Sequence, residues 1–373
     1  MSSITDPPSG SFRLSMLFND KRYRSLTFQA IAAIILALSI WYLGNNLIQN
    51  LRQAGLNISF EFLGSVSGYD INQSLVEYDS QSTHATAAIV GVLNTLLVAF
   101  LACITATVLG VLAGVLRLSN NWLVSKLMAV YVEIFRNIPV LIWIIIIFTI
   151  MTSVMPSPRD FRGDNAEASM LFEAFAFTNR GIYVPAPVWG AGSLVVVLTF
   201  VASVIGIFAY RRYATKMLFD TGRLLPTLWP SIAFFFVPTI LMHFVMGQPV
   251  TLDYPVLGGF NFSGGIQLGG PLIALWLALS IYTGAFIAEN VRAGIQAVSR
   301  GQTEAAGALG MRPGRIMSLV VLPQALRVII PPLISQYLNI TKNSSLAIAV
   351  GYADVTATLG GITLNQTGRA IEC

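Results

Sequence analysis

Charged side chains are scarce in this sequence. Lys and Arg together number 22 and Asp and Glu 17 among 373 residues, so 10% of the chain is charged. An ordinary soluble domain carries about a quarter. Hydrophobic residues make up 55% of the chain, and the mean hydropathy is +0.70. This balance excludes an ordinary soluble domain and indicates a membrane protein.

Cysteine and histidine are almost absent. The two cysteines are Cys103, inside an apolar run, and Cys373, the last residue, and the two histidines are His84 and His243. None of the four has companions at metal-binding spacing, so neither a disulfide framework nor a metal site is expected. The sequence also lacks the pattern GxxxxGK[ST], which cradles the phosphates of a bound nucleotide. We therefore expect this chain to bind no cofactor itself.

Long uncharged runs predict the number of membrane crossings. A helix needs roughly 20 apolar residues to cross the ~30 Å hydrocarbon core of a bilayer, and each run is long enough for one crossing. A further stretch, 316–341, is interrupted only by Arg327, and we expect a seventh crossing there, kinked by Pro323, Pro331 and Pro332. The six uncharged runs are 25–51, 85–116, 137–158, 181–210, 224–252 and 254–288.

Lysine and arginine are distributed unevenly between these runs. If the N-terminus is cytoplasmic, four clusters of them fall on the cytoplasmic side, as the positive-inside rule requires. The first outer segment, 52–84, is instead mainly acidic. The net charge of +5 is therefore a topology signal, and the first run lacks a signal-peptide cleavage site. The clusters are Lys21, Arg22 and Arg24; Arg117 and Lys126; Arg211, Arg212, Lys216 and Arg223; and Arg292, Arg300, Arg312 and Arg315.

The chain divides into five parts by composition. Residues 1–24 are predicted to be a cytoplasmic leader, and 25–84 the first span with its outer loop. The segments 85–155 and 271–373 carry the better-patterned helical core. Between them, 156–270 is interpreted as an insertion of two spans with their loops. No convincing internal repeat is present.

A short polar segment separates the last two apolar stretches. In "SRGQTEAAGALG", Ser299 and Gln302 have the spacing of a capping box, and Gly310 suits a left-handed helix end. Pro313 can start another helix, because its missing N–H costs little at the first position. We expect a compact helix over 299–311, held on the cytoplasmic side between two spans as a docking element.

This segment resembles the EAA motif of ABC importer permeases, with Val where Ile is commoner. In that family the motif forms the coupling helix, which sits in a groove of the cytoplasmic ATPase. The resemblance implies that Glu304 anchors a cation on the ATPase, and the alternative is a solvated helix charge. The matching positions are Glu304, Ala305, Ala306, Gly310, Val320, Leu322 and Pro323. Of these, we assign Glu304, Ala305, Ala306, Gly310 and Pro323 to the ATPase contact.

Other stretches narrow the resemblance to permeases of polar amino-acid importers. They are "YVEIFRNIPVLI" (131–142), "AFIAENVRAGIQAV" and "KNSSLAIAVGYADV" (342–355). With the two inserted spans and "NQTGRAIE", the layout looks most like the Q-type permease subunit of the general L-amino acid transporters. That family usually ends with one more transmembrane helix, so we expect the final span to be missing from this chain.

The resemblance implies a fold and a function. We expect an all-α polytopic membrane protein with the type I ABC importer permease fold of the methionine and maltose importers, carrying extra spans. It would be a permease subunit, not an enzyme, that imports L-amino acids across the bacterial inner membrane by alternating access. The implied partners are an ABC ATPase dimer, which would bind ATP and Mg, a second homologous permease subunit and a periplasmic amino-acid-binding protein. No nucleic-acid partner is expected.

Three residues near the C-terminus are candidates for substrate contact. Asp354 lies in a segment rich in Gly, Ser and Thr between apolar runs, where broken helix ends can hold the charged groups of a zwitterion. Related permeases with an internal site use an acidic residue in the matching segment. Asn343 and Ser344 could supply hydrogen bonds to the substrate, or could cap the preceding helix.

Three further candidates are charged residues near the ends of spans. Glu133 and Arg136 stand three residues apart and could face a central cavity or pair with each other. Glu289 could also approach the substrate, or could pair with Arg292 on the same helical face. Facing a water-filled cavity and forming an ion pair would each offset the free-energy cost of placing a charge near lipid.

Two other classes of membrane protein compete with the importer prediction. An ion-coupled secondary carrier of small polar solutes, the alternative function, should show matching halves and ionisable residues near mid-span. A membrane enzyme should show clustered His, Asp or Cys. The sequence has none of these features, so the permease remains the main prediction.

Overall fold

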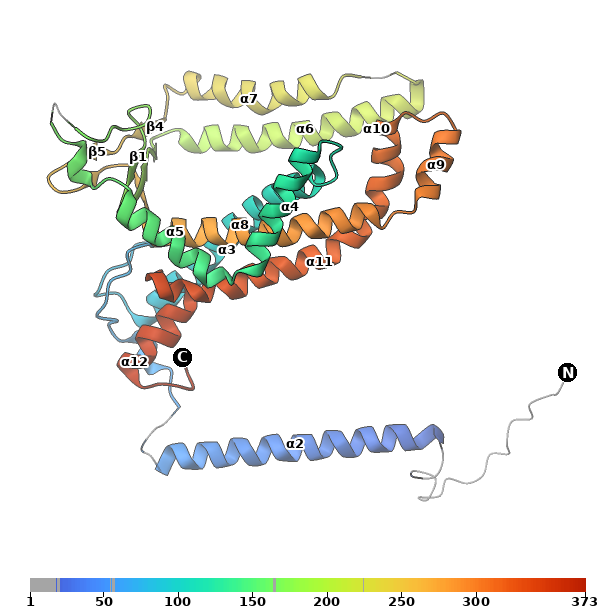
Figure 1. Ribbon diagram of the computed structural model, residues 1–373. Helices are drawn as coiled ribbons and strands as arrows, with labels where there is room; N and C mark the ends of the chain where they lie inside the picture. The colour runs from blue at the N-terminus through green and yellow to red at the C-terminus, as the bar shows by residue number, and fades with distance from the viewer. Residues whose placement is uncertain (1–17, 19–20, 54, 56–57, 164–165, 224) are drawn as a thin grey trace. The chain divides into compact units, whose positions relative to one another are not determined.

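The structure is a computed structural model that describes residues 18, 21–53, 55, 58–163, 166–223 and 225–373. This part of the chain is mostly helical (Figure 1). It contains six helices long and apolar enough to cross a membrane, and a bent pair of shorter helices makes up to seven. With the bent pair counted as one crossing, the number equals the seven expected. The chain forms two units, residues 1–62 with 369–372, and residues 63–368 with Cys373.

The first unit is built on one long helix, α2 (Lys21–Gln53). Most of its described side chains are exposed, as suits an apolar helix surrounded by lipid. In the same unit, the backbone N–H of Ser59 donates to Glu372 Oε1 over 3.1 Å, and Arg369 pairs with that carboxylate at the same distance. The Ser59 bond fastens the C-terminal turn to the segment that follows α2, and the Arg369 pair lies within that turn.

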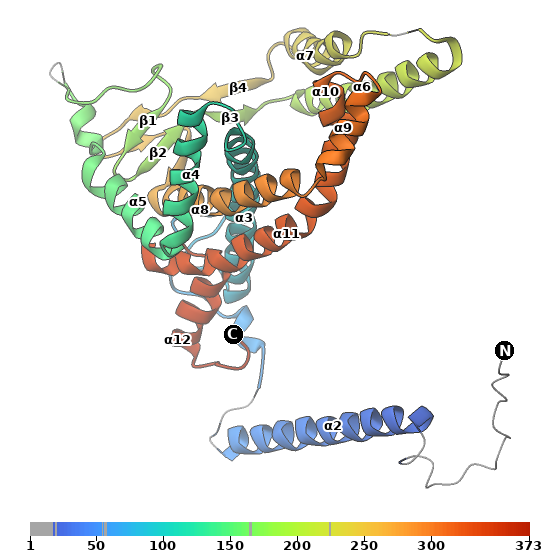
Figure 2. The same cartoon turned by 45° about the vertical axis from the view of Figure 1, so that its right-hand side comes forward.

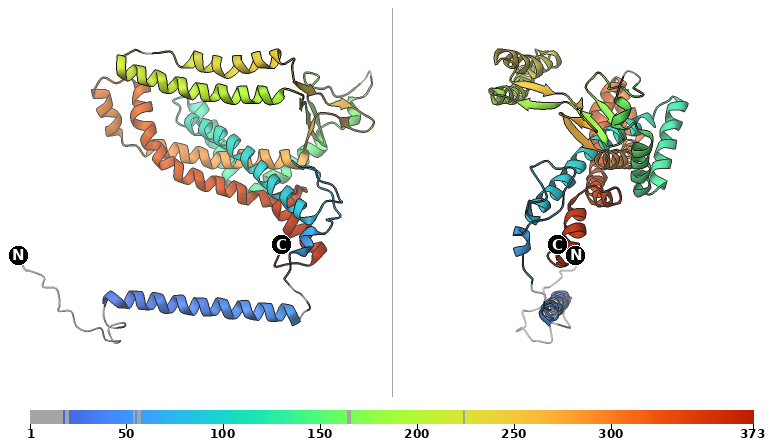
Figure 3. Two further views of the ribbon diagram at one scale, coloured as in Figure 1. Left: turned by 180° about the vertical axis from the view of Figure 1, so that it is seen from behind. Right: turned by 90° about the vertical axis from the view of Figure 1, so that its left-hand side faces the viewer.

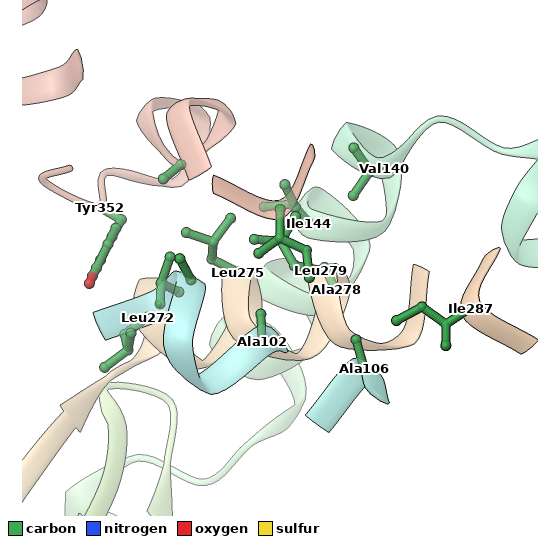
Figure 4. Close-up of a cluster of buried hydrophobic side chains, with 14 of the residues drawn as sticks. Ala102, Ala106, Val140, Ile144, Leu272, Leu275, Ala278, Leu279, Ile287 and Tyr352 are labelled. Atoms are coloured by element: carbon green, nitrogen blue, oxygen red, sulfur yellow. The ribbon is translucent and has the colours of Figure 1, made fainter. Parts of the chain in front are cut away.

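The second unit is organised around α8 (Gly270–Gln296). In its most apolar window 67% of the residues are buried, against 33% in α3 (His84–Leu116), which packs along it. Small residues allow this close approach. A Cβ atom on Gly110 would lie 2.5 Å from Ile287 Cβ. Figure 4 shows the buried cluster where side chains of α3, α5 and α8 meet.

Two short helices, α4 (Trp122–Asn137) and α5 (Val140–Val154), make a bent pair with 104° between them. The Asn121 side chain caps α4 by accepting from the N–H groups of Leu123 and Val124. Pro139 stands at the break. The run 137–158 does not cross by itself, because the 15 residues of α5 span only about 22 Å.

The α6–α7 hairpin consists of α6 (Ser193–Thr221) and α7 (Leu228–Val245), which lie side by side in Figures 1 and 3. The antiparallel strands β3 (Ala186–Trp189) and β4 (Val250–Asp253) close it at one end. In a second sheet, β2 (Gly181–Val184) lies between β1 (Ala176–Thr178) and β7 (Ile266–Gly269), which leads directly into α8. A third pair joins β5 (Val256–Leu257) and β6 (Phe262–Ser263).

These strands correct the limits of three expected crossings. The runs 181–210 and 254–288 begin as strands, and their helices start only at Ser193 and Gly270. The run 224–252 ends inside β4. Uncharged apolar sequence suits both a helix in lipid and a packed strand, so the absence of charge did not distinguish them. Pro185 and Pro187 favour extended backbone before α6.

The chain turns back at the C-terminal end of α8. Helix α9 (Arg300–Ala308) and the short α10 (Pro313–Ile316) lie away from the strands in Figures 1 and 2. A π-helical turn, Met317–Val321, then leads into α11 (Leu322–Asn343), which stays helical through its two internal prolines.

Beyond α11 the chain forms three short helical pieces. They are the 3-10 helix η4 (Ser344–Val350), the π-helix η5 (Thr356–Thr363) and α12 (Leu364–Thr367). Gly351, with a φ of 76°, breaks the chain between η4 and η5.

Candidate functional site

The segment that follows α8 forms the compact helix predicted from its sequence. Helix α9 begins after Ser299 and ends in a Schellman motif, with Met311 N–H donating to Ala306 O and Gly310 N–H to Gly307 O. Gly310 has a φ of +77°, as its position in the motif requires. The capping box expected from Ser299 is not formed, because its side chain makes no capping hydrogen bond.

Helix α9 exposes one acidic and several apolar side chains. Ala306 is buried on the inner face, whereas Glu304 and Ala305 are exposed. Leu309, one turn after Ala305, is 83% exposed. A single exposed apolar side chain is common on protein surfaces, so Leu309 bears on docking only through its place beside Glu304 on this helix. The sequence interpretation missed Leu309, although its place inside "GALG" offered a signal. Pro323 is exposed in the first turn of α11.

Glu289 lies near the C-terminal end of α8, the helix that precedes α9. Its carboxylate pairs with Arg117 at the end of α3 and with Arg292 on α8. Arg292 Nη1 also donates to Gln296 Oε1 over 2.7 Å. Of the two predicted roles for Glu289, the ion pair is therefore formed, and it extends to a second helix. The cluster ties α3 to α8 beside the candidate docking helix.

Replacing Glu289 by glutamine is expected to destabilise the folded chain by about 1–3 kcal/mol, because two guanidinium groups lose a shared anion. Thermal unfolding of the detergent-purified protein measures this. Glu133→Gln is a matched control, since Glu133 is exposed and makes no ion pair with any described residue. Unchanged stability of Glu289→Gln, together with lost substrate binding, would assign Glu289 to the substrate instead.

Glu133 and Arg136 do not pair with each other in the part of the chain that the structure describes. Both are exposed on α4. The Arg136 guanidinium lies over the ring of Phe286, 5.2 Å from its centroid. One turn earlier, the Tyr131 hydroxyl donates to the carbonyl of Ile281 over 2.7 Å. These contacts fix the face of α4 against α8.

Asp354 is completely buried at a joint with α3. Its Oδ1 accepts from the N–H of Ala357 over 2.8 Å, which caps the start of η5. The joint is tight, because a Cβ on Gly91 would lie 2.2 Å from Thr358 Oγ1. Ser344 is also buried and donates to Thr341 O over 2.8 Å, whereas Asn343 makes no capping bond. Substrate contact at Asp354 would require this joint to open.

The structure does not bring the substrate candidates into one site. Asp354 contacts α3 near Gly91, whereas Glu289 contacts Arg117 at the other end of that helix. These two points on α3 are about 40 Å apart at 1.5 Å per residue. Asp354 and Ser344 lie close to each other. Arg136 and Glu289 belong to the packing of α4, α3 and α8, whereas Glu133 is exposed on α4.

A polar cavity of about 220 Å³, the outer cavity, lies at the N-terminal end of α8. Asn94, fully buried on α3, connects two of its walls by donating to Gln73 O (2.7 Å) and Ala353 O (2.9 Å). No site residue proposed from the sequence lines it. The walls consist of residues 72–73, Arg180, Gln267, 269–272 and 351–353.

Metal ligands are not gathered at any of these places. Within the described ranges, no group of three or more His, Cys, Asp or Glu side chains could hold an ion. The candidate functional features are therefore the α9 segment at one end of α8 and the outer cavity at the other.

Comparison with known proteins identifies the family. Residues 196–368 match the family model of the "binding-protein-dependent transport system inner membrane component". The chain is 49% identical to the glutamate/glutamine/aspartate/asparagine transport system permease protein BztB of Rhodobacter capsulatus, over 100% of this chain and 93% of that protein. It belongs to the permease subunits of amino-acid ABC importers.

Two further relatives cover the permease over most of its length. It is 46% identical to the general L-amino acid transport system permease protein AapQ of Rhizobium johnstonii, over 97% of the permease and 88% of AapQ. It is 43% identical to the putative amino-acid ABC transporter permease protein YhdX of Escherichia coli K12, over 96% and 89%. One solved structure, an amino acid ABC transporter with histidines, has 20% identity and a TM-score of 0.42, covering 78% of the permease and 83% of that chain.

The family membership confirms the main predictions from the sequence. The permease is a mostly helical, multi-pass inner-membrane component of an ATP-driven amino-acid importer, and ATP hydrolysis belongs to a separate subunit. The alternative, an ion-coupled secondary carrier, is excluded by this membership.

Proposed function

We propose that α9 is the coupling helix through which the permease receives the force of ATP hydrolysis. The supporting observation is its form, a nine-residue helix with a Schellman end that buries Ala306 and exposes Glu304 and Leu309. A carboxylate beside an uncovered leucine suits a partner groove with an apolar floor and a cation at its rim. An ABC ATPase dimer is the partner, and it binds the ATP and Mg.

The orientation follows from the same helix. With the N-terminus in the cytoplasm, α9 lies on the cytoplasmic side and all the paired strands lie on the periplasmic side. The strand pairing supports placing these segments on the same side of the membrane, since β7, which precedes α8, pairs with β2, which precedes α6. The arginines and lysines that follow α3, α6 and α8 are then cytoplasmic.

The remaining partners follow from the need for a complete transport path, of which one permease subunit forms half. A second homologous permease subunit completes the path, and a periplasmic amino-acid-binding protein delivers L-amino acids to the outer face. Closure of the ATPase dimer moves α9, and the two permeases rock to expose the substrate alternately to either side. Asp354, with Asn343 and Ser344 beside it, contacts the substrate ammonium group when the joint with α3 opens.

Affinity purification in mild detergent, followed by mass spectrometry and reconstitution, tests this assignment. The expected result is co-purification of an ABC ATPase and a second permease, with amino-acid uptake into proteoliposomes only when ATP and the loaded binding protein are present. A chain that purifies alone and transports without ATP would overturn it.

A further inference from the structure

We propose that the outer cavity is a second binding site, which holds the carboxylate group of a free amino acid on the periplasmic face of the permease. The inference rests on the proposed importer function for the identity of its ligand. The cavity adjoins the candidate substrate region, since residues 351–353 line it, but Asp354 itself does not.

The charge of the cavity selects an anion. Arg180 is the one charged side chain in its walls, and no carboxylate lines them. In the described part of the chain Arg180 forms no ion pair, and its Nη1 makes only a long hydrogen bond, 3.4 Å, to the carbonyl of Phe260. A guanidinium with unused donors matches a carboxylate in shape and charge.

The first turn of α8 adds backbone N–H donors, which favour an anion as Arg180 does. This 27-residue helix starts at the cavity with Gly269 as its N-cap, so no N-cap side chain caps its first turn, in which Pro271 alone lacks an N–H. The N-terminus of a long helix carries a partial positive charge and favours an anion. A bound carboxylate would supply the missing cap while pairing with Arg180.

The other walls suit the remainder of an amino acid. Gln73 Oε1 accepts from Gly269 N–H over 3.1 Å, which directs the free donors of its amide elsewhere. Gln267 donates through Nε2 to Arg180 O over 3.2 Å, so its Oε1 remains an acceptor for an ammonium group. At about 220 Å³ the cavity is smaller than the roughly 300–1,000 Å³ sites that hold drug-sized ligands. A small zwitterion therefore fits better than a larger solute.

Two features of the fold shape the cavity, and the first of them positions Arg180 beside α8. Gly181 pairs with Gly269 in the β2–β7 ladder, and it has a φ of +132°. A Cβ on Gly181 would lie only 2.2 Å from Leu268 O, so only glycine permits this approach. Asn94 holds the walls at Gln73 and Ala353 from the α3 side. The cavity is thus built by the segment before α6 together with the helical core.

Equilibrium binding to the whole importer complex in nanodiscs, without the binding protein, tests the proposal. Radiolabelled L-glutamine, L-glutamate and L-alanine are the probes, with L-glutaminamide, which lacks the carboxylate, as a competitor. Arg180→Gln is expected to weaken binding of the best probe at least tenfold, because a charged hydrogen-bonded pair is lost. L-Glutaminamide is expected to compete poorly.

Arg162→Gln is the matched control. Arg162 is also exposed and also contacts the 258–260 loop, through Gly258 O at 3.1 Å, but it does not line the cavity. The Arg162→Gln complex should bind the probe as the wild-type complex does. Equal binding by Arg180→Gln and the wild type, or no binding by either while ATP-driven uptake proceeds, would overturn the cavity site and leave the importer function intact.

Two other outcomes separate the sources of the carboxylate and the two proposals. If Arg180→Gln binds free amino acids normally but no longer binds the ligand-free periplasmic protein, the cavity takes a side chain of that protein and our assignment is wrong. If the wild-type complex shows no ATP-driven uptake of any amino acid, the proposed function fails, and with it the basis for this ligand.

Discussion

Replacing Glu304 by lysine is expected to abolish ATP-driven uptake and the stimulation of the ATPase, while leaving the permease in the membrane. Glu304 is exposed on α9 and makes no ion pair within the described residues, so its loss should not unfold the chain. In the docked complex the lysine would face the ATPase cation that Glu304 is proposed to bind. Such like-charge contacts cost several kcal/mol. Uptake and ATPase rates in proteoliposomes measure both effects.

The control for this experiment lies on the same helix. Gln302→Lys places a lysine at another exposed position of α9, about 200° around the helix axis from Glu304, although it raises the charge by one unit where Glu304→Lys raises it by two. It should retain most of the uptake. Normal uptake by Glu304→Lys would contradict the coupling assignment. Equal loss of uptake in both variants would show that a lysine at either position of α9 is enough to cause it.

Replacing Gly110 by valine is expected to prevent close packing of α3 on α8. The new Cβ would lie 2.5 Å from Ile287 Cβ and 2.8 Å from the carbonyl oxygen of Gly284. The carbonyl belongs to the backbone of the most buried span, so it cannot give way without moving α8. We expect a destabilisation of about 3 kcal/mol, the upper part of the usual range for overpacking. The yield of monodisperse protein and its unfolding temperature in detergent measure it.

Gly44 provides the comparison within the same chain. It lies in α2, also a helix of membrane-spanning length, and a Cβ there would meet nothing within 4 Å. Gly44→Val should therefore leave the unfolding temperature nearly unchanged. If the two variants were equally destabilised, the effect would come from the general cost of valine in a membrane helix, and the close α3–α8 contact would carry no weight.

The features of the fold that depend on local sequence were predictable. Charge-free runs indicated the crossings, and Gly310 indicated a helix end. The strands around the α6–α7 hairpin were not predicted, because their apolar residues were counted as parts of spans. Pairing such as that of β2 with β7 joins residues more than 80 positions apart, and no local pattern specifies it.

The site was predictable only where it consists of one continuous segment. Glu304 and its neighbours form a single helix, so the motif gave their arrangement directly. The substrate candidates were chosen as charges near apolar runs, and their partners come from other helices, as Arg117 does for Glu289. Arg180 was missed because an arginine in an outer loop has no distinguishing local pattern. Its neighbour Gly181 was the one available signal of a close backbone approach.

The closure of the α6–α7 hairpin by β3 and β4 has a consequence for how such permeases diversify. A pair of crossings returns the chain to the side from which it left, and the antiparallel pairing of Ala186–Trp189 with Val250–Asp253 brings the two ends together. Gain or loss of the whole hairpin therefore leaves the sidedness of α8, α9 and α11 unchanged, and a short connection can bridge the gap. A single added helix would invert everything downstream, so a lineage can vary this region only in units of two.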